Sequence, residues 1–179
     1  MRRPLGPPLM YIETKEIGPE GLVVERVIEG ISLALNDEMV RIGGAHLTGE
    51  ALKEDEGVAF SGDIVAEATL HCSRCLEEFI LPLQLHFDLL FTPDPEPAEG
   101  GEHRVEEESI TRAHLEGGRI DLKALVAEQV DLGLPLKPLC RPDCAGLCPR
   151  CGTNRNQGTC GCREERDDDP RLRVLKDLV

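Results

Sequence analysis

The stretch FILPLQLHFDLLF, residues 79–91, decides the fold of this chain. Apolar side chains occupy every second position, and the positions between them include Gln84, His86 and Asp88. Successive side chains of a β-strand point to opposite faces, so this alternation predicts one long strand with a single buried face. Pro82 has no backbone N–H to donate, which predicts that the strand lies at a sheet edge or bends there. The alternating apolar residues are Phe79, Leu81, Leu83, Leu85, Phe87, Leu89 and Phe91.

The residues before this strand predict further strands of the same sheet. Gly30, the residues Asn36 to Glu38 and the residues 54–57 have turn chemistry and separate short apolar runs. We expect residues 21–91 to form an antiparallel sheet, a sandwich or an open barrel. The predicted strands are 22–28, 31–35, 39–42, 45–53 and 58–71.

A helix is predicted at residues 121–132. Asp121 can cap its start, and Gly133 and Pro135 stop the pattern. Its apolar stripe should pack on the sheet and consists of Leu122, Leu125, Val126 and Val130. Farther along, Asp169-Pro170 predicts the start of a short final helix.

These patterns predict an α+β protein with an antiparallel β-sheet or open-barrel body and one packed helix. A small C-terminal cysteine-rich metal-binding tail follows and ends in a short helix. The Pro- and Gly-rich start predicts an arm, and the acidic, Pro- and Gly-rich middle predicts a linker. The parts are 1–20 (N-terminal arm), 21–91 (β body), 92–119 (linker), 120–136 (helix) and 137–179 (tail).

The composition favours a cytoplasmic protein. No apolar run approaches the roughly 20 residues that a membrane helix needs. Met1, Arg2 and Arg3 are typical of a signal-peptide start, but prolines follow and no continuous apolar segment comes after them. We therefore expect no membrane contact. In the cytoplasm, the eight cysteines favour metal binding or redox chemistry over disulfides.

Charge is distributed unevenly along the chain. The net charge is −14; residues 137–179 hold nine basic and seven acidic residues, a net of +2, which leaves −16 for residues 1–136. Such a body repels phosphate backbones, so it suits a basic protein partner, unless the acidic surface serves solubility alone. Any direct RNA contact belongs to the tail, where the candidate contact residues are Arg141, Arg150 and Arg155.

Six cysteines of the tail are the candidate ligands of a structural Zn²⁺ ion. Their segment contains little other apolar surface, so metal–thiolate bonds must order it, with about 10–16 kcal/mol available in small zinc modules. The net charge of −2 on a four-thiolate zinc site would be offset by the basic residues around it. The six candidates are Cys140, Cys144, Cys148, Cys151, Cys160 and Cys162.

The spacing of Cys148 and Cys151 is that of a zinc knuckle, so these two form the surest pair. Their partners are either Cys140 and Cys144 or Cys160 and Cys162. The earlier pair is favoured, because the helix and Pro135 hold it rigidly, whereas the later pair is separated by one residue only.

A separate pair, Cys72 and Cys75, falls between two predicted strands and therefore lies in a hairpin turn. Thioredoxin-type chemistry needs a helix N-terminus beside the thiols, and that context is missing. Two alternatives stand: the pair completes a zinc site with the tail, or it forms a turn with free thiols. His71 beside it is better explained as a solvated residue of the sheet than as a ligand.

Catalytic motifs are missing from the sequence. It contains no H-E-x-x-H zinc motif, no phosphate-binding P-loop and no G-x-G-x-x-G dinucleotide motif. Acidic runs such as 106–108 are typical of solvated charge. We expect a protein that is not an enzyme and has no small-molecule substrate.

Several motifs occur in a specific order over about residues 20–179. They are CSRCLEEF (72–79), IDL (120–122), VAE (126–128), LP (134–135), LCRPDCAGLCPRCGTNRN (139–156) and DPR (169–171). In this order they resemble the bacterial and plastid family of large ribosomal RNA subunit accumulation proteins (YceD-like). Some members of that family lack the tail cysteines, so the resemblance implies a metal site that stabilises the chain or presents it to a partner.

The resemblance also implies a function. It predicts a non-enzymatic ribosome biogenesis factor that supports the synthesis, processing or stability of 23S ribosomal RNA. The partner would be a ribosomal precursor particle, bound through a basic protein or through rRNA. Two alternatives belong to other classes: a zinc-stabilised protein-interaction module unrelated to ribosomes, and a thiol-based redox or metal sensor.

Overall fold

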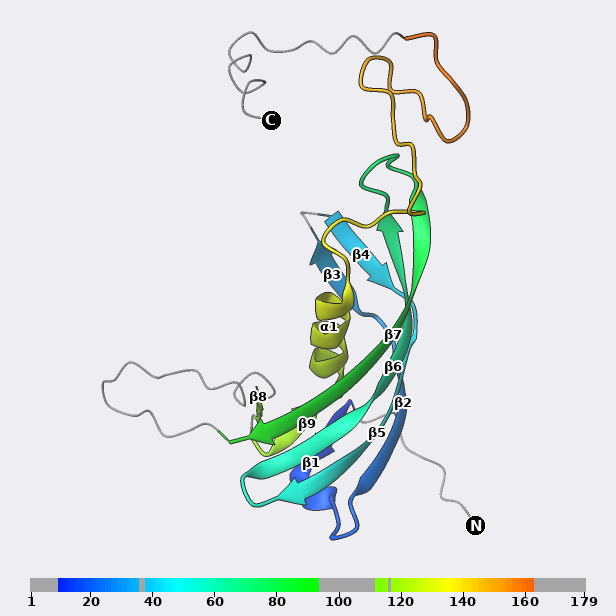
Figure 1. The fold of residues 1–179 in the computed structure, drawn as a ribbon. Coiled ribbons are helices and arrows are strands. Elements are labelled where there is room, and N and C mark those ends of the chain that lie inside the picture. Colours follow the sequence, from blue (N-terminus) through cyan, green and yellow to red (C-terminus); the bar gives the residue numbers. More distant parts are fainter. Residues whose placement is uncertain (1–9, 36–37, 94–111, 116, 163–179) are drawn as a thin grey trace, which may run out of the picture.

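The computed structural model describes residues 10–35, 38–93, 112–115 and 117–162. These residues form a curved seven-stranded sheet, a small two-stranded sheet and the helix α1 (Leu122–Gly133) on the concave side of the large sheet (Figure 1). The large sheet does not close on itself. The predicted α+β fold, with a mostly antiparallel sheet and one packed helix, is confirmed.

Two long strands, β6 and β7, form the backbone of the large sheet. They pair antiparallel over almost their whole length, and β5 and β4 lie end to end along the other edge of β6. β2 pairs with β5, and β3 pairs with β4. The bounds are β2 (Leu22–Ile28), β3 (Ser32–Leu35), β4 (Glu38–Ile42), β5 (Ala45–Glu54), β6 (Gly57–His71) and β7 (Glu78–Thr92).

The concave face holds the core. Every second side chain of β6 is buried there, and the alternating apolar residues of β7 face the same side. Phe60 is fully buried and meets Phe87 edge to face, with ring centroids 5.1 Å apart. Pro82 lies where β7 has no strand on its outer edge within the described part of the chain, which fits its missing N–H.

Helix α1 begins where the sequence predicts. The carboxylate of Asp121 accepts hydrogen bonds from the N–H groups of Lys123 and Ala124 at 2.9 and 3.0 Å, so it caps the first turn. The buried residues of the helix are the predicted stripe Leu122, Leu125, Val126 and Val130. Within the described residues, none of the helices has both the length and the apolar character that a bilayer crossing needs.

The start of the chain differs from the predicted arm. Residues 11–13 form β1 (Tyr11–Glu13), which pairs with β9 (Arg119–Asp121), and η1 (Thr14–Glu16) follows. Ile12 and Ile17 belong to the core, with 4% and 2% of their surface exposed. β1 is three residues long and buries a single side chain, so no local period predicts this strand. Its partner lies about 110 residues farther along the chain.

The predicted linker also differs at its end, because β8 (Arg112–His114) pairs parallel with β7 and β9 begins at Arg119. Other predictions lie outside the described residues. They concern the linker residues 94–111, the turn residues 36–37 and the short final helix within 163–179.

Candidate metal centre

All eight cysteines gather at one end of the molecule. The loop between β6 and β7 lies beside the chain that leaves α1, and the tail continues from there (Figure 1). The N–H of Ser73 in this loop donates to the carbonyl of Pro138 at 2.8 Å, which ties the two segments together. None of the cysteines is in a disulfide.

Cluster 1 joins the hairpin loop to the start of the tail. It consists of Cys72, Cys75, Cys140 and Cys144, whose Sγ atoms all lie within 4.8 Å of one another. Three of these side chains are buried, and that of Cys140 is partly buried. The loop that joins β6 to β7 carries Cys72 and Cys75, and the chain that follows α1 carries Cys140 and Cys144.

The sulfur positions of cluster 1 fit a tetrahedral ion. Two Sγ–Sγ distances, Cys72 to Cys144 and Cys75 to Cys140, are both 3.7 Å. These two edges share no sulfur, as opposite edges of a tetrahedron do. A tetrahedron with metal–sulfur bonds of about 2.3 Å has edges of about 3.8 Å. The same separation is far longer than the roughly 2.05 Å of a disulfide.

Cluster 2 lies wholly within the tail. It consists of Cys148, Cys151, Cys160 and Cys162, and its Sγ atoms are also within 4.8 Å of one another. Cys148 is buried, Cys151 is exposed, and the other two are partly buried. Cluster 2 is therefore the more accessible of the two candidate sites.

The hairpin loop of cluster 1 has the backbone of a metal knuckle. The N–H of Leu76 donates to the carbonyl of Cys72 at 2.9 Å, and the N–H of Cys72 donates to the carbonyl of Glu77 at 2.9 Å. Leu76 has φ of 60° and is the one residue other than glycine with positive φ in the described part of the chain. This conformation costs an L-residue about 1–2 kcal/mol, so the knuckle is held by its surroundings.

Cluster 2 repeats the same knuckle. The N–H of Gly152 donates to the carbonyl of Cys148 at 2.9 Å, and the N–H of Cys148 donates to the carbonyl of Thr153 at 2.9 Å. Gly152 stands where cluster 1 has Leu76, and its φ is 71°. A glycine takes this conformation without steric cost. Two Cys-x-Arg-Cys loops thus present their thiols in the same way.

Asn156 connects the residues around cluster 1 through its side-chain hydrogen bonds. Its Nδ2 donates to the Sγ of Cys144 at 3.3 Å and to the Oδ1 of Asn154 at 2.9 Å. Its Oδ1 accepts from the N–H of Ala145 and from the guanidinium of Arg141, both at 2.8 Å. Hydrogen bonds of this kind orient metal ligands and tune their basicity.

A second link comes from the hairpin loop itself. Arg74 Nη1 donates to the carbonyl of Cys144 at 2.9 Å, and the carbonyl of Arg74 accepts from the N–H of Leu147 at 3.0 Å. Gly146, with φ of 70°, packs so closely here that a Cβ would lie 3.0 Å from the Arg74 carbonyl oxygen. The tail is therefore bound to the sheet by backbone as well as by sulfur.

The thiols of cluster 1 divide into two kinds. Burial raises the pKa of Cys72, but hydrogen bonds from the backbone of Cys140, Cys75 and Arg74 outweigh it and lower this pKa to about 6. Burial and hydrogen bonds with the neighbouring thiols raise the pKa of Cys140 to about 12. Four thiolates this close repel one another, so all four ionise only around a cation.

Cluster 2 shows the same division. Hydrogen bonds from the backbone of Cys151 and Arg150 lower the pKa of Cys148 to about 6. The hydrogen bond with Cys151, followed by burial, raises the pKa of Cys162 to about 12. Both clusters therefore offer four sulfur donors that could hold a metal ion. Tetrahedral sets of four thiolates are typical of structural zinc sites.

The favoured ligand grouping of the sequence analysis is wrong. The structure places Cys140 and Cys144 with the hairpin pair in cluster 1 rather than with Cys148 and Cys151. Cys148 and Cys151 take the later pair, Cys160 and Cys162, which was the alternative. The physical reason is that the hairpin loop already forms a knuckle beside the end of α1. Cys140 and Cys144, the first two cysteines of the tail, therefore complete a set of four with Cys72 and Cys75.

The three arginines predicted to contact RNA or a partner lie around these clusters. Arg141 bonds to Asn156 and lies 3.4 Å from the carboxylate of Asp143, so it has a structural role. Arg150 is exposed within the second knuckle, and the N–H of Arg155 donates to the carbonyl of Gly146 at 2.9 Å.

The protein has a curved, mostly antiparallel sheet, one four-cysteine cluster that joins a hairpin loop to the tail, and a second such cluster within the tail. These features define its class: an α+β protein with two knuckle sites suited to metal ions. Comparison with known proteins also identifies the family of this chain. The family model of the large ribosomal RNA subunit accumulation protein YceD matches residues 60–179, and the chain belongs to this family. The match includes most of β6 and all of β7, α1 and both clusters.

Curated relatives agree with the family. An uncharacterized protein of Mycobacterium tuberculosis is 37% identical over 97 residues, which are 54% of this chain and 44% of the relative. Two proteins named large ribosomal RNA subunit accumulation protein YCED homolog 1, chloroplastic, also match. That of Arabidopsis thaliana is 26% identical over 140 residues, covering 66% of this chain and 44% of the relative. That of Zea mays is 27% identical over 118 residues, covering 53% and 40%.

The matched region spans less than half the length of these curated relatives. No solved structure matches the chain.

Proposed function

We propose that this chain is a non-enzymatic ribosome biogenesis factor that supports the synthesis, processing or stability of 23S ribosomal RNA. The observation that carries the proposal is the family match over residues 60–179. The names of the plant relatives support it, because they refer to accumulation of the large-subunit ribosomal RNA. A role at ribosomes is our reason for proposing a cytoplasmic location for this chain. The plant relatives, by contrast, are named as chloroplastic.

Zn²⁺ is the proposed occupant of both clusters, in a structural role. Four thiolates at tetrahedral spacing support this choice, because structural zinc is most often four-coordinate with cysteine ligands. Such an ion has no open position for a substrate or a water molecule. This complete ligand set is our reason for proposing a structural part rather than an enzyme.

The proposed partner is a ribosomal precursor particle, reached through a basic protein or through rRNA. The net charge of −16 on residues 1–136 favours a basic protein for the body. The tail is the part with positive charge, and Arg150 and Arg155 lie beside the clusters. Changing both to Glu should weaken association with precursor particles in sedimentation, while both ions stay bound. Unchanged sedimentation would argue against a contact through the tail.

The experiment that tests the function is depletion of the protein in the organism that makes it. We expect a fall in mature 23S rRNA relative to 16S rRNA, with accumulation of large-subunit precursors. Expression of the unaltered protein should restore the ratio, and a Cys144→Ser variant should restore it less well. A depleted strain with normal 23S levels and normal subunit profiles would refute the proposal.

One observation favours a second candidate function, a thiol-based redox or metal sensor. The Cys151 thiol of cluster 2 is exposed, whereas three thiols of cluster 1 are buried. A sensor would release the ion of cluster 2 on mild oxidation with hydrogen peroxide and regain it after reduction. An ion that stays bound while free cysteine is oxidised would exclude this role.

A further inference from the structure

The outer edge of β2 pairs with no strand of the described residues. β2 lies at the end of the strand order of the large sheet, and β5 is its one strand partner among the described residues. All seven residues of β2 pair with β5 on the inner side. An edge strand of this kind is a ready template for another extended chain.

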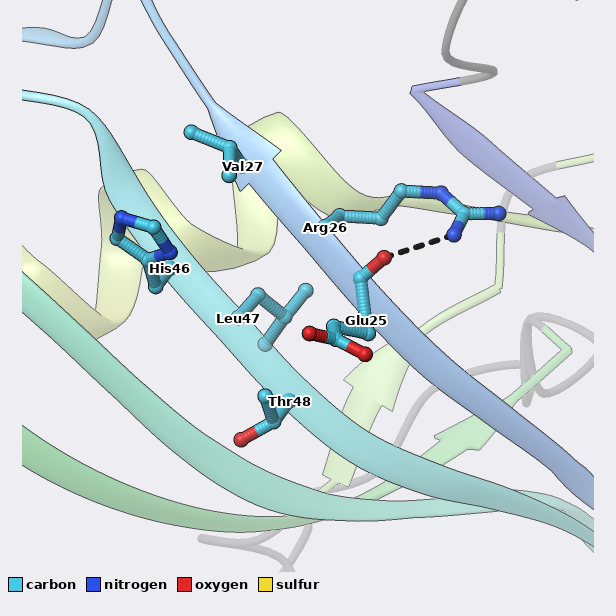
Figure 2. A pocket seen from close by; sticks show the side chains of 6 residues that line it. All are labelled: Glu25, Arg26, Val27, His46, Leu47 and Thr48. Atoms are coloured by element: carbon cyan, nitrogen blue, oxygen red, sulfur yellow. Dashed lines mark hydrogen bonds between the residues drawn. The ribbon is translucent and has the colours of Figure 1, made fainter. Parts of the chain in front are cut away.

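The direction of these backbone groups follows from one hydrogen bond. Nη1 of Arg26 donates to the carbonyl of Glu25 at 2.8 Å, and Figure 2 shows this carbonyl directed away from β5. Residues two apart in a strand point their backbone N–H and C=O groups to the same side. Val23 and Val27 therefore also present these groups on the outer edge. The Arg26 guanidinium occupies the Glu25 carbonyl in the unbound chain, so an added strand would replace this bond with one from its own backbone N–H.

The residues that usually protect a sheet edge are missing from β2, although the Arg26 side chain occupies the Glu25 carbonyl and must release it before another strand can pair there. Natural edges are commonly blocked by proline, lysine or a bulge, and β2 (LVVERVI) has none of these. Val23 is 78% exposed and Val27 is 47% exposed, and both are β-branched residues that favour pairing with another strand.

Charge beside the edge selects the kind of partner. Glu25 is exposed on the convex face, and so is Glu50 of β5, which pairs with Val23. A hollow of about 240 Å³ spans β2 and β5 next to the edge (Figure 2). Its lining residues are Glu25, Arg26, Val27, His46, Leu47 and Thr48.

Two other occupants fit the edge poorly. If a second copy paired all seven residues of β2 with its own β2 in antiparallel register, Glu25 would stand opposite Glu25, and like charges at directly opposite positions are unfavourable. RNA brings phosphates to a body with a net charge of −16, and this repels it.

We propose that the outer edge of β2 binds an extended, basic segment of a large-subunit ribosomal protein as an additional strand. Backbone hydrogen bonds supply the pairing, Val23 and Val27 contact apolar side chains, and Glu25 meets a lysine or arginine. The proposal rests on the proposed role at the ribosome, and it names the class of partner and the surface that meets it.

The test uses a substitution that removes one edge N–H and leaves the inner ladder intact. Val23→Pro does this because its N–H points outward, where proline is tolerated in edge strands. Val23→Thr is the matched control, since it keeps both the N–H and the β-branched shape. Each full-length chain, loaded with Zn²⁺, is immobilised and offered an RNA-free mixture of large-subunit ribosomal proteins and, separately, protein-free 23S rRNA.

We expect the unaltered chain and Val23→Thr to retain the same ribosomal proteins, and Val23→Pro to retain at least tenfold less of them. Hydrogen exchange at residues 22–28 should slow on binding in the first two only. Glu25→Lys provides a second variant with an unaltered backbone, and it should also bind at least tenfold less well.

Each contrary result has a distinct meaning. Equal retention by Val23→Pro and Glu25→Lys, with unchanged exchange over 22–28, overturns the edge site and leaves the ribosomal role standing. An unaltered chain that retains none of these proteins overturns the partner class. If it also fails to sediment with precursor particles, the proposed function fails too. Binding of the rRNA that Val23→Pro abolishes would assign the edge to RNA and overturn the proposal.

Discussion

Changing Asn156 to Ala should weaken metal binding at cluster 1 without touching a ligand. The amide of Asn156 makes four hydrogen bonds, and one of them goes to the Cys144 sulfur. When the amide is removed, the thiolate loses a donor that favours its charged form. The neighbouring segment also loses the group that holds it against the cluster. We expect the ion to bind less tightly, although all four sulfurs remain.

The size of the effect follows from these four bonds. A hydrogen bond contributes about 0.5–1.5 kcal/mol net, and one to a charged group contributes about 1.5–3 kcal/mol. Arg141 and Ala145 are exposed, so water replaces part of what they lose. The remaining loss is about 1.5–3 kcal/mol, which corresponds to a roughly 10- to 150-fold lower affinity. Losses of 10- to 100-fold are also typical when the hydrogen-bond partners of metal ligands are removed.

The assay is competition for Zn²⁺ between the protein and a coloured chelator. Measurements in a Cys162→Ser background isolate cluster 1, because cluster 2 then lacks a ligand. Thr159→Ala, an exposed change in the same tail, is the control and should leave the affinity unchanged. Asn156→Asp should be worse than Ala, since its carboxylate repels the thiolate. An affinity of Asn156→Ala within twofold of the unaltered chain would refute the reasoning.

Three further predictions concern the ions and the core. The purified chain should hold two Zn²⁺ ions and Cys162→Ser one, as counted by elemental analysis; an unchanged count would contradict the assignment of cluster 2. Cys140 and Cys162 each have a pKa of about 12 and so carry protons at pH 7, which metal binding must displace. Affinity should therefore rise with pH, and adding ZnCl₂ to weakly buffered protein should acidify it; a constant indicator colour would count against this. Phe60→Ala should lower the free energy of unfolding by about 3–5 kcal/mol in urea, whereas Leu52→Ala, at a side chain 42% exposed, should change it by less than about 1 kcal/mol.

Most of the sheet could be predicted from the sequence, because its signals are local. The alternation over residues 79–91 and the capping position of Asp121 are visible within a dozen residues, and both are confirmed. The strand at Tyr11 could not be predicted, because it depends on β9, far along the chain. Its one buried side chain, Ile12, has no neighbours in the sequence that reveal a period.

The candidate site was predicted only in part for a similar reason. Cluster 2 uses one contiguous stretch, whereas cluster 1 joins Cys75 to Cys140 across 65 residues. No spacing rule connects two pairs so far apart. One signal was available: the loops Cys72-Ser-Arg-Cys75 and Cys148-Pro-Arg-Cys151 share spacing and an arginine, and eight cysteines make two sets of four. The conformation of Leu76 was not predictable, because glycine is the usual residue there.

The difference in span between the clusters sets an order of assembly. Bringing two ends of a flexible chain together costs about 0.6 kcal/mol more for each doubling of length, so the 65-residue span of cluster 1 costs about 2 kcal/mol more than the short span within cluster 2. Cluster 2 needs only its own short stretch of chain to capture its ion. Cluster 1 must wait for the finished hairpin and for the helix that brings the tail to it. An ion in cluster 1 therefore marks a molecule whose body is already complete.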